Sequence, residues 1–332
     1  MTENNMKKET SLDYDESYTD INKAWEKDNQ AWWDWYVSLA DNPTTKQALI
    51  KLPNPPKIKY STIHELKKEL SNPYKITKNN IKDFQKNGFI KLKNVFSPQA
   101  VNVLRYEIIS LLKKNFKNYY EIKKNRFLSL DLMWLTNTLI KEFVLSSRIA
   151  KICADLLSLK KIRLYHDNAL VKESGCGRTP WHFDDHHFPL ATNDVVTAWI
   201  PAQAIPIEMG PLMFAKPLDV HKLVKDVKLN QFDKMYDKTI NNIFKEKEVL
   251  VVEEPFEIGE VSFHHNLSFH AASENKTNQS RIVLANTYFG DGARVVKNPT
   301  MISGDWKKFI PETNPGEIVS SNLNPICWPA NQ

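Results

Sequence analysis

Apolar and polar positions in the first third of the chain follow mainly helical spacing. Residues 21–42 (INKAWEKDNQAWWDWYVSLADN) and a short stretch near 62–71 predict amphipathic helices. A helix through IKDFQKNG is expected to end at Gly88, because glycine readily adopts the left-handed cap conformation. After the alternating segment FIKLKNVF, which predicts a strand, Ser97 and Pro98 are a typical N-cap and first residue of a long helix.

From residue 160 onward the pattern changes to that of short strands bounded by Pro, Gly and Asn. The segments are KIRLYHDNALVKE, TPWHFDDHHFP, NDVVTAWIPAQ and PLMFAKP, followed after a charged stretch by EVLVVEEPFEIGEVSFHHNLSFHAAS and SRIVLANTYFGDG. Helices first and many short strands afterwards predict a mostly β fold, a double-sheet jelly roll with supporting helices.

The same pattern divides the chain into three predicted regions. Residues 1–79 form a helical N-terminal extension, with the Trp-rich helix and a proline-punctuated wrap. Residues 80–300 form the β domain, which carries an insertion at 217–250, and residues 301–332 form a tail packed on the core. The tryptophans of the first helix are expected to pack against the core or a partner, and this helix and the insertion are candidate lids.

Composition narrows the class of protein. The chain has 332 residues, of which 42% are hydrophobic, and its three cysteines are far apart, so neither a disulfide framework nor a cysteine zinc site is expected. The polar N-terminus lacks the apolar core of a signal peptide, which predicts a cytoplasmic protein. Three prolines interrupt the most apolar region, 195–215, so we expect no membrane span.

The formal net charge of +6 is partly concentrated in residues 105–126, which hold seven basic and two acidic residues. A solvated helix face is the favoured interpretation, and a rim that attracts an anionic substrate is the alternative. No nucleic-acid motif accompanies this charge, so we do not expect a nucleic-acid partner.

The candidate chemistry begins in TPWHFDDHHFPL, residues 179–190. If this segment is a strand, His182 and Asp184 project to the same side, and a distant histidine would complete a 2-His-1-carboxylate site. Such a site leaves positions open on the metal and is diagnostic of non-haem Fe(II) oxygenases. The tripeptide HxD alone is a weak signal, since a polar cluster at a strand end has the same appearance.

A second segment, GEVSFHHNLSFHAASENKTNQSRIVL, makes the metal site the better interpretation. It offers His264, His265 and His270 as the distant histidine. It also places Arg281 in an otherwise apolar strand, where a buried guanidinium is costly unless it binds an anion. A carboxylate ligand bound in two-pronged fashion would satisfy Arg281.

Together the motifs from DNALVKE through TPWHFDDHHFP, VVTAWIPA and MGPLMFAKP to the second segment resemble the phytanoyl-CoA dioxygenase family. Its members are Fe(II)- and 2-oxoglutarate-dependent oxygenases on a double-stranded β-helix, a cupin-like jelly roll, and the resemblance covers roughly residues 80–295. It implies that His182, Asp184 and His270 bind iron. It also implies that Arg281, eleven residues after His270, binds the distal carboxylate of 2-oxoglutarate.

The resemblance also assigns a second group of residues. Trp199, Asn168 and Ser273 fall where the family lines the 2-oxoglutarate pocket. His186 would lie on the metal side if the strand continued and could reach the substrate, with a rim position as the alternative. The chain departs from the family's usual pattern at Met209 and Phe183, which affects the detailed shape of the pocket.

The implied reaction is hydroxylation of an unactivated C–H bond of a small molecule, with O2 consumed and succinate and CO2 released. Related halogenases lack the carboxylate at the position of Asp184, so its presence argues against halogenation. Desaturation, cyclisation or epimerisation on the same triad is the enzymatic alternative, and a non-catalytic metal-binding jelly roll is the alternative of a different class. The substrate is not specified, although the basic segment favours an anionic one.

Overall fold

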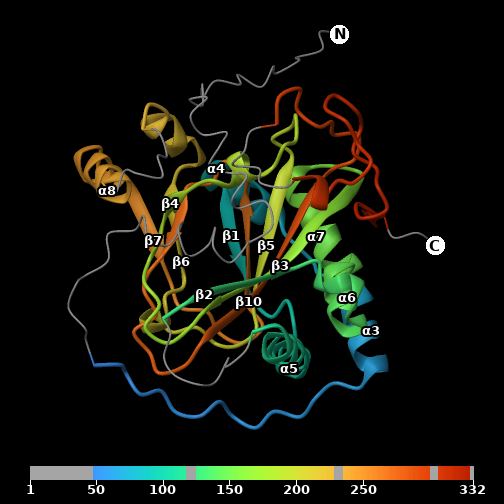
Figure 1. The fold of residues 1–332 in the computed structure, drawn as a ribbon, viewed down its shortest axis with the longest axis vertical. Coiled ribbons are helices and arrows are strands. Elements are labelled where there is room, and N and C mark those ends of the chain that lie inside the picture. Colours follow the sequence, from blue (N-terminus) through green and yellow to red (C-terminus); the bar gives the residue numbers. More distant parts are fainter. Residues whose placement is uncertain (1–47, 117–124, 228–234, 300–305, 330–332) are drawn as a thin grey trace.

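Two antiparallel sheets form the centre of the molecule, as the strand pattern predicted (Figure 1). The computed structural model describes residues 48–116, 125–227, 235–299 and 306–329, so the predicted helix at 21–42 lies outside the described part. The larger sheet has the strand order β1-β8-β5-β10-β3-β11, with β2 also paired to β3, and the smaller sheet has the order β4-β9-β6-β7.

The strands are β1 (Phe89–Leu92), β2 (Phe127–Asp131), β3 (Ile162–Lys172), β4 (Thr179–His182), β5 (Val195–Pro201), β6 (Leu212–Lys216), β7 (Leu250–Glu253), β8 (Val261–His265), β9 (His270–Ala272), β10 (Arg281–Gly290) and β11 (Ile326–Trp328). The α-helices are α3 (Ile63–Ser71), α4 (Lys78–Asn87), α5 (Pro98–Asn115), α6 (Thr138–Val144), α7 (Ser147–Leu157) and α8 (Tyr236–Glu246). Short 3-10 segments are η1 (Met133–Leu135), η2 (Asp184–His187), η3 (Ile207–Met209), η4 (Leu218–Val224) and η6 (Trp306–Lys308).

The caps read from the sequence set the boundaries of the early helices. Thr62 and Glu65 form a reciprocal capping box at the start of α3. Gly88 ends α4 in the left-handed region at φ 81°, and the Ser97 side chain accepts from the amide of Ala100 at the start of α5. The predicted helix ends at Gly88 and Ser97 are therefore confirmed.

Helices cover the outer faces of both sheets. In Figure 1, α3, α6 and α7 lie on one side of the larger sheet, while α8 lies beyond the smaller sheet on the opposite side. The helices and the larger sheet share one continuous apolar core, and α8 and η4 share a second one with the smaller sheet. None of the helices in the described ranges is both long and apolar enough to cross a membrane.

Alternation along the central strand β10 decides which side chains enter the space between the sheets. Ile282 and Leu284 belong to the core shared with the helices, whereas Val283 and Ala285 pack among the apolar residues between the sheets. Arg281 therefore starts β10 on the inner side, because successive side chains of a strand point to opposite faces. Every residue of β10 is buried.

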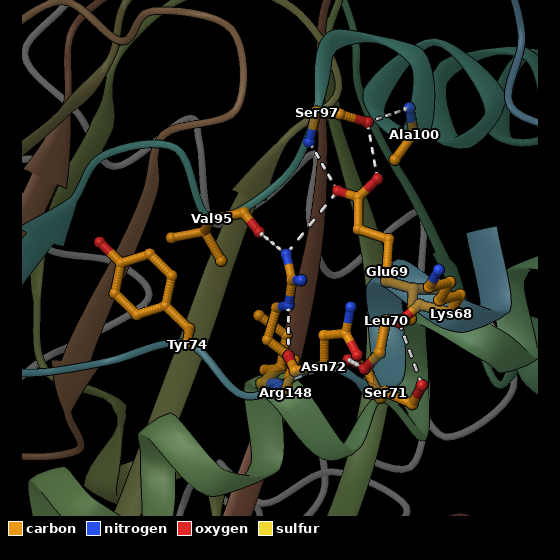
Figure 2. A network of polar contacts seen from close by, with 12 residues as sticks. Lys68, Glu69, Leu70, Ser71, Asn72, Tyr74, Val95, Ser97, Ala100 and Arg148 are labelled. Carbon is orange, nitrogen blue, oxygen red and sulfur yellow. Dashed lines mark hydrogen bonds and ion pairs between the residues drawn. The ribbon is translucent and has the colours of Figure 1, made fainter. Parts of the chain in front are cut away.

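A half-buried polar network joins α3 to the rest of the helical layer (Figure 2). The carboxylate of Glu69 accepts from the backbone N–H of Ser97 at 2.6 Å and from its hydroxyl at 2.7 Å. Arg148, whose Nη1 lies 3.7 Å from the same carboxylate, donates to the carbonyls of Val95 at 2.6 Å and Asn72 at 2.8 Å. One carboxylate thus holds the start of α5 and the guanidinium of α7 against α3.

Replacing Glu69 with Ala should lower the free energy of unfolding by about 2 kcal/mol, because the amide and hydroxyl of Ser97 lose their acceptor and Arg148 loses its ion-pair partner. The change is measured by urea unfolding followed by circular dichroism. Glu246→Ala is the matched control, since its ion pair with Lys247 is exposed and should contribute little. Equal midpoints for the two variants would contradict this account of the network.

Candidate active site

Three side chains meet at one end of the smaller sheet and could hold a metal ion. One ligand atom each from His182, Asp184 and His270 lies within 4.8 Å of the others. Oδ1 of Asp184 is 3.8 Å from Nε2 of His182 and 3.7 Å from Nε2 of His270, and the two imidazole centroids are 4.1 Å apart. The predicted pairing of the HxD histidine with His270, rather than with His264 or His265, matches this geometry.

Strand pairing places the two histidines opposite each other. His182 is the last residue of β4 and His270 the first of β9, and they are direct partners in the sheet. Phe183 keeps an extended backbone at φ −132° and ψ 149°, so Asp184 faces the same side as His182, although it already begins η2.

The condition under which His186 would lie on the metal side, a strand that continues past Asp184, is not met, because η2 turns the chain after Phe183. The backbone of His186 lies within this 3-10 turn, and its side chain is outside the part that the structure describes. Its suggested contact with the substrate therefore stays a prediction, and strand alternation no longer supports it.

Backbone carbonyls fix the tautomers of both histidines. Nδ1 of His182 lies 2.8 Å from the carbonyl of Pro180, and Nδ1 of His270 lies 2.9 Å from that of Ser268. Because a carbonyl only accepts, both Nδ1 atoms carry the hydrogen and both Nε2 lone pairs are left for a metal. Burial lowers the pKa of His182 well below its ordinary value and that of His270 to about 4, so both are neutral ligands near pH 7.

The second oxygen of Asp184 is held by residues that sequence analysis did not assign. Oδ2 lies 3.2 Å from Nε2 of His264, which must donate because the carboxylate only accepts, and 3.3 Å from the hydroxyl of Thr197. These two bonds leave Oδ1 directed at the histidines. The signal was present in the sequence as a threonine in the otherwise apolar strand VVTAWIP and as the first histidine of the pair that ends VSFHH.

These residues belong to a polar row that crosses the larger sheet. His264, Thr197, Thr287 and His166 are successive cross-strand partners on β8, β5, β10 and β3. The hydroxyls of Thr197 and Thr287 are 3.0 Å apart. Burial lowers the pKa of His166 to about 4, and its ring packs against that of Phe309 at 4.7 Å.

Arg281 lies buried between the sheets without an acidic partner among the described residues. Its Nη1 donates to the carbonyl of Gly210 at 2.6 Å, its guanidinium carbon lies 5.4 Å from the centre of the Trp199 ring, and its Nε has no hydrogen-bond partner. Burial lowers the pKa of Arg281 to about 10, so it stays charged near pH 7. A buried, incompletely satisfied guanidinium suits an anionic ligand.

Two of the other predicted pocket residues share the inner face of the larger sheet. Trp199 and Asn168 are both direct partners of Ala285, one on each side of β10, so all three face the same way. The amide oxygen of Asn168 accepts from the hydroxyl of Ser129 at 2.7 Å. The contact that the structure gives Ser273 is through its backbone carbonyl, which accepts from Lys172 at 2.8 Å.

The described part of the 217–250 insertion is attached directly to the strand that ends at His182. The fully buried carboxylate of Asp237, in α8, accepts from the amide of Trp181 at 3.0 Å and pairs with Arg178 at 3.2 Å. The indole N–H of Trp181 donates to Asn241 at 2.8 Å. Helix α8 therefore supports β4 from outside the smaller sheet (Figure 1).

Comparison with known proteins agrees with this geometry. A family model described as phytanoyl-CoA dioxygenase (PhyH) matches residues 84–283. No curated protein sequence matches the chain.

Solved structures with a similar fold share little sequence with the chain. The α-ketoglutarate-dependent carbocyclase SnoK from nogalamycin biosynthesis is 20% identical, with a TM-score of 0.63, 77% of this chain and 99% of that chain covered. The epimerase SnoN from the same biosynthesis, in complex with Fe3+, α-ketoglutarate and a nogalamycin compound, is 19% identical, with a TM-score of 0.60 and coverage of 75% and 97%. EctD from S. alaskensis, with 2-oxoglutarate and 5-hydroxyectoine, is 15% identical, with a TM-score of 0.57 and coverage of 75% and 89%.

Replacing His264 with Phe should weaken Fe(II) binding about tenfold or more, because Asp184 loses the donor that holds its second oxygen. Iron titration of the metal-free protein measures the change. His265→Phe is the control: the neighbouring histidine packs near Phe84 and accepts from the amide of Leu267, so its loss should leave the affinity unchanged. Unaltered iron affinity in His264→Phe would contradict the supporting role.

Proposed function

The chain belongs to the phytanoyl-CoA dioxygenase family of 2-oxoglutarate-dependent oxygenases, and we propose that it hydroxylates an unactivated C–H bond of a small molecule. In this proposal His182, Asp184 and His270 hold Fe(II), and 2-oxoglutarate and O2 are co-substrates that yield succinate and CO2. The observation that carries the proposal is the convergence of two imidazole nitrogens and one carboxylate oxygen within 4.8 Å, at the edge of the space between the sheets in which Arg281 is also buried.

The donor set fits iron of this class. Two neutral imidazoles and one carboxylate on the same side form a 2-His-1-carboxylate triad, which leaves positions open on the metal. Bound Fe(II) would supply the coordination sites for the keto acid and for O2, and O2 is the oxidant of the reaction. The protein's own contribution is orientation: carbonyls fix both histidine tautomers, while His264 and Thr197 fix the carboxylate.

We propose that Arg281 binds the distal carboxylate of 2-oxoglutarate beside the ring of Trp199. The guanidinium keeps N–H donors that the described residues do not use, and its apolar surroundings strengthen a charge-assisted hydrogen bond. Asn168 and Ser273 are further proposed contacts of the co-substrate. The similar structures support the class of ligand, since SnoN and EctD were solved with this keto acid.

A second outcome of the same chemistry is desaturation, cyclisation or epimerisation of the substrate. The similar folds include a carbocyclase and an epimerase, so the fold accommodates such reactions. Mass spectrometry of the product separates the two proposals: hydroxylation adds one oxygen atom, whereas the alternatives remove two hydrogens or leave the mass unchanged. A panel of small molecules, anionic ones included, read by succinate formation would identify the substrate.

His182→Ala, Asp184→Ala and His270→Ala should each abolish iron-dependent release of succinate from 2-oxoglutarate, because each removes one of three ligands. Succinate release and an iron titration measure this in parallel. His221→Ala is the control, since His221 lies on η4 and its Nδ1 pairs with the carbonyl of Leu218. Normal turnover in any of the three triad variants would remove the assignment.

Arg281→Ala should raise the 2-oxoglutarate concentration needed for half-maximal activity at least about 30-fold, since truncating one partner of a buried charge pair removes several kcal/mol. Iron affinity should be nearly unchanged, because Arg281 is not a ligand in this proposal. Saturation by 2-oxoglutarate at the wild-type concentration would refute the role of Arg281.

A further inference from the structure

Arg281 has a second buried cation directly opposite it. The cross-strand partner of Arg281 on β3 is Lys172, so both side chains enter the space between the sheets. Their exposed fractions are 2% and 0%. Like charges placed directly opposite each other in a sheet are destabilising, and burial increases the repulsion.

No carboxylate of the described residues forms an ion pair with either cation, and the charge of Glu274 raises the pKa of Lys172 only as the smallest of the influences on it. The two nearest acids along the chain are engaged elsewhere: Glu173 pairs with Arg126 at 2.6 Å, and Glu274 pairs with Lys276 at 3.0 Å. Burial, and after it the charge of Arg281, lowers the pKa of Lys172 well below its ordinary value. Burial and the neighbouring guanidinium thus both oppose a positive charge on Lys172, and an anion bound between the sheets would favour that charge.

Backbone carbonyls hold the ammonium of Lys172 in place. Its Nζ lies 2.9 Å from the carbonyl oxygen of Gly177, 3.2 Å from that of Ala272 and 2.8 Å from that of Ser273. Three acceptors require all three hydrogens of the charged form, so no N–H remains for a ligand. Lys172 can therefore act on a ligand through its charge, and through the backbone that it fixes.

The two cations also bond to two backbone segments that lie against each other. Arg281 donates to the carbonyl of Gly210, and a Cβ placed on Gly210 would lie 2.2 Å from the carbonyl oxygen of Ser273, which Lys172 holds. Ala272 is the last residue of β9, which starts at His270, and Ser273 is the next residue. The charges are thus fixed beside the strand that carries one of the proposed iron ligands.

We propose that Lys172 is a positioning residue of the 2-oxoglutarate site, whose charge makes the site selective for keto acids with a second carboxylate. This inference rests on the proposed function. Arg281 supplies hydrogen bonds to the distal carboxylate, and Lys172 adds a second positive charge that the dicarboxylate compensates. A keto acid with one carboxylate would bind the iron but leave both cations uncompensated.

The test compares two keto acids that share the C1 carboxylate and the 2-oxo group. Binding of 2-oxoglutarate and of 2-oxobutyrate, which lacks the distal carboxylate, is measured by calorimetry under anaerobic conditions on the Fe(II)-loaded protein. Lys172→Met should weaken the binding of 2-oxoglutarate about tenfold and that of 2-oxobutyrate much less, since only 2-oxoglutarate has a distal carboxylate that the removed charge would attract. Lys151→Met is the matched control, because that lysine pairs with Asp155 on α7 and should change neither constant.

Equal weakening of both keto acids would show that Lys172 only supports the backbone, and unchanged binding of 2-oxoglutarate would also overturn the inference. A wild-type protein that binds neither compound with iron would overturn the proposed function itself, and this inference with it. If Lys172→Met does not fold, Arg281→Leu gives a second test with Lys172 in place. That variant should keep a measurable preference for 2-oxoglutarate over 2-oxobutyrate, and a complete loss of preference would overturn the role of Lys172.

Discussion

The antiparallel pairing of β4 with β9 is the constraint on which the candidate site depends. It sets His182 opposite His270, two residues that are 88 positions apart in the sequence, at the edge of the space between the sheets. Each neighbouring element preserves that pairing: Asp237 of α8 holds the amide of Trp181, and Phe214 on β6 pairs with His270 from the other side. A shift of one residue in this register would turn one imidazole to the opposite face of the sheet.

The space between the sheets is mostly apolar, and the arrangement of its few polar groups suits the binding of ligands more than it suits stability. At one end a carboxylate and two neutral imidazoles are held by carbonyls, a hydroxyl and a further histidine. At the other end two cations lie side by side with backbone carbonyls as their partners. One end of the space thus favours a metal ion, and the other end favours an anion. A keto acid that binds iron and carries a second carboxylate needs both.

Close packing of apolar side chains between the sheets holds both the metal-binding cluster and the pair of cations in fixed positions. Trp199, Phe214 and Val283 belong to one apolar cluster between the sheets. The ring of Trp199 lies 5.4 Å from the guanidinium carbon of Arg281, and the ring of Phe214 lies 5.9 Å from that of His270. Low polarity in this region strengthens each hydrogen bond that is made and makes each unmatched charge expensive. The same surroundings that keep the histidines neutral therefore also make the pair of Arg281 and Lys172 a place where an anion gains most.

The sequence by itself determined the order of helices and strands, the caps at Gly88 and Ser97, and the types of residue available for chemistry, because these depend on local periodicity and short spacings. It also indicated His182, Asp184, His270 and Arg281 through family resemblance.

Only the tertiary structure decided which side chains meet. The support of Asp184 by His264 joins the turn after β4 of the smaller sheet to β8 of the larger sheet, and the placement of Lys172 against Arg281 comes from cross-strand register. Both bring together segments about 80 to 110 residues apart. The end of the strand before His186 depends on a turn that periodicity alone does not reveal. Pairing between distant strands is set by the packing of whole sheets, and no local pattern in the sequence encodes it.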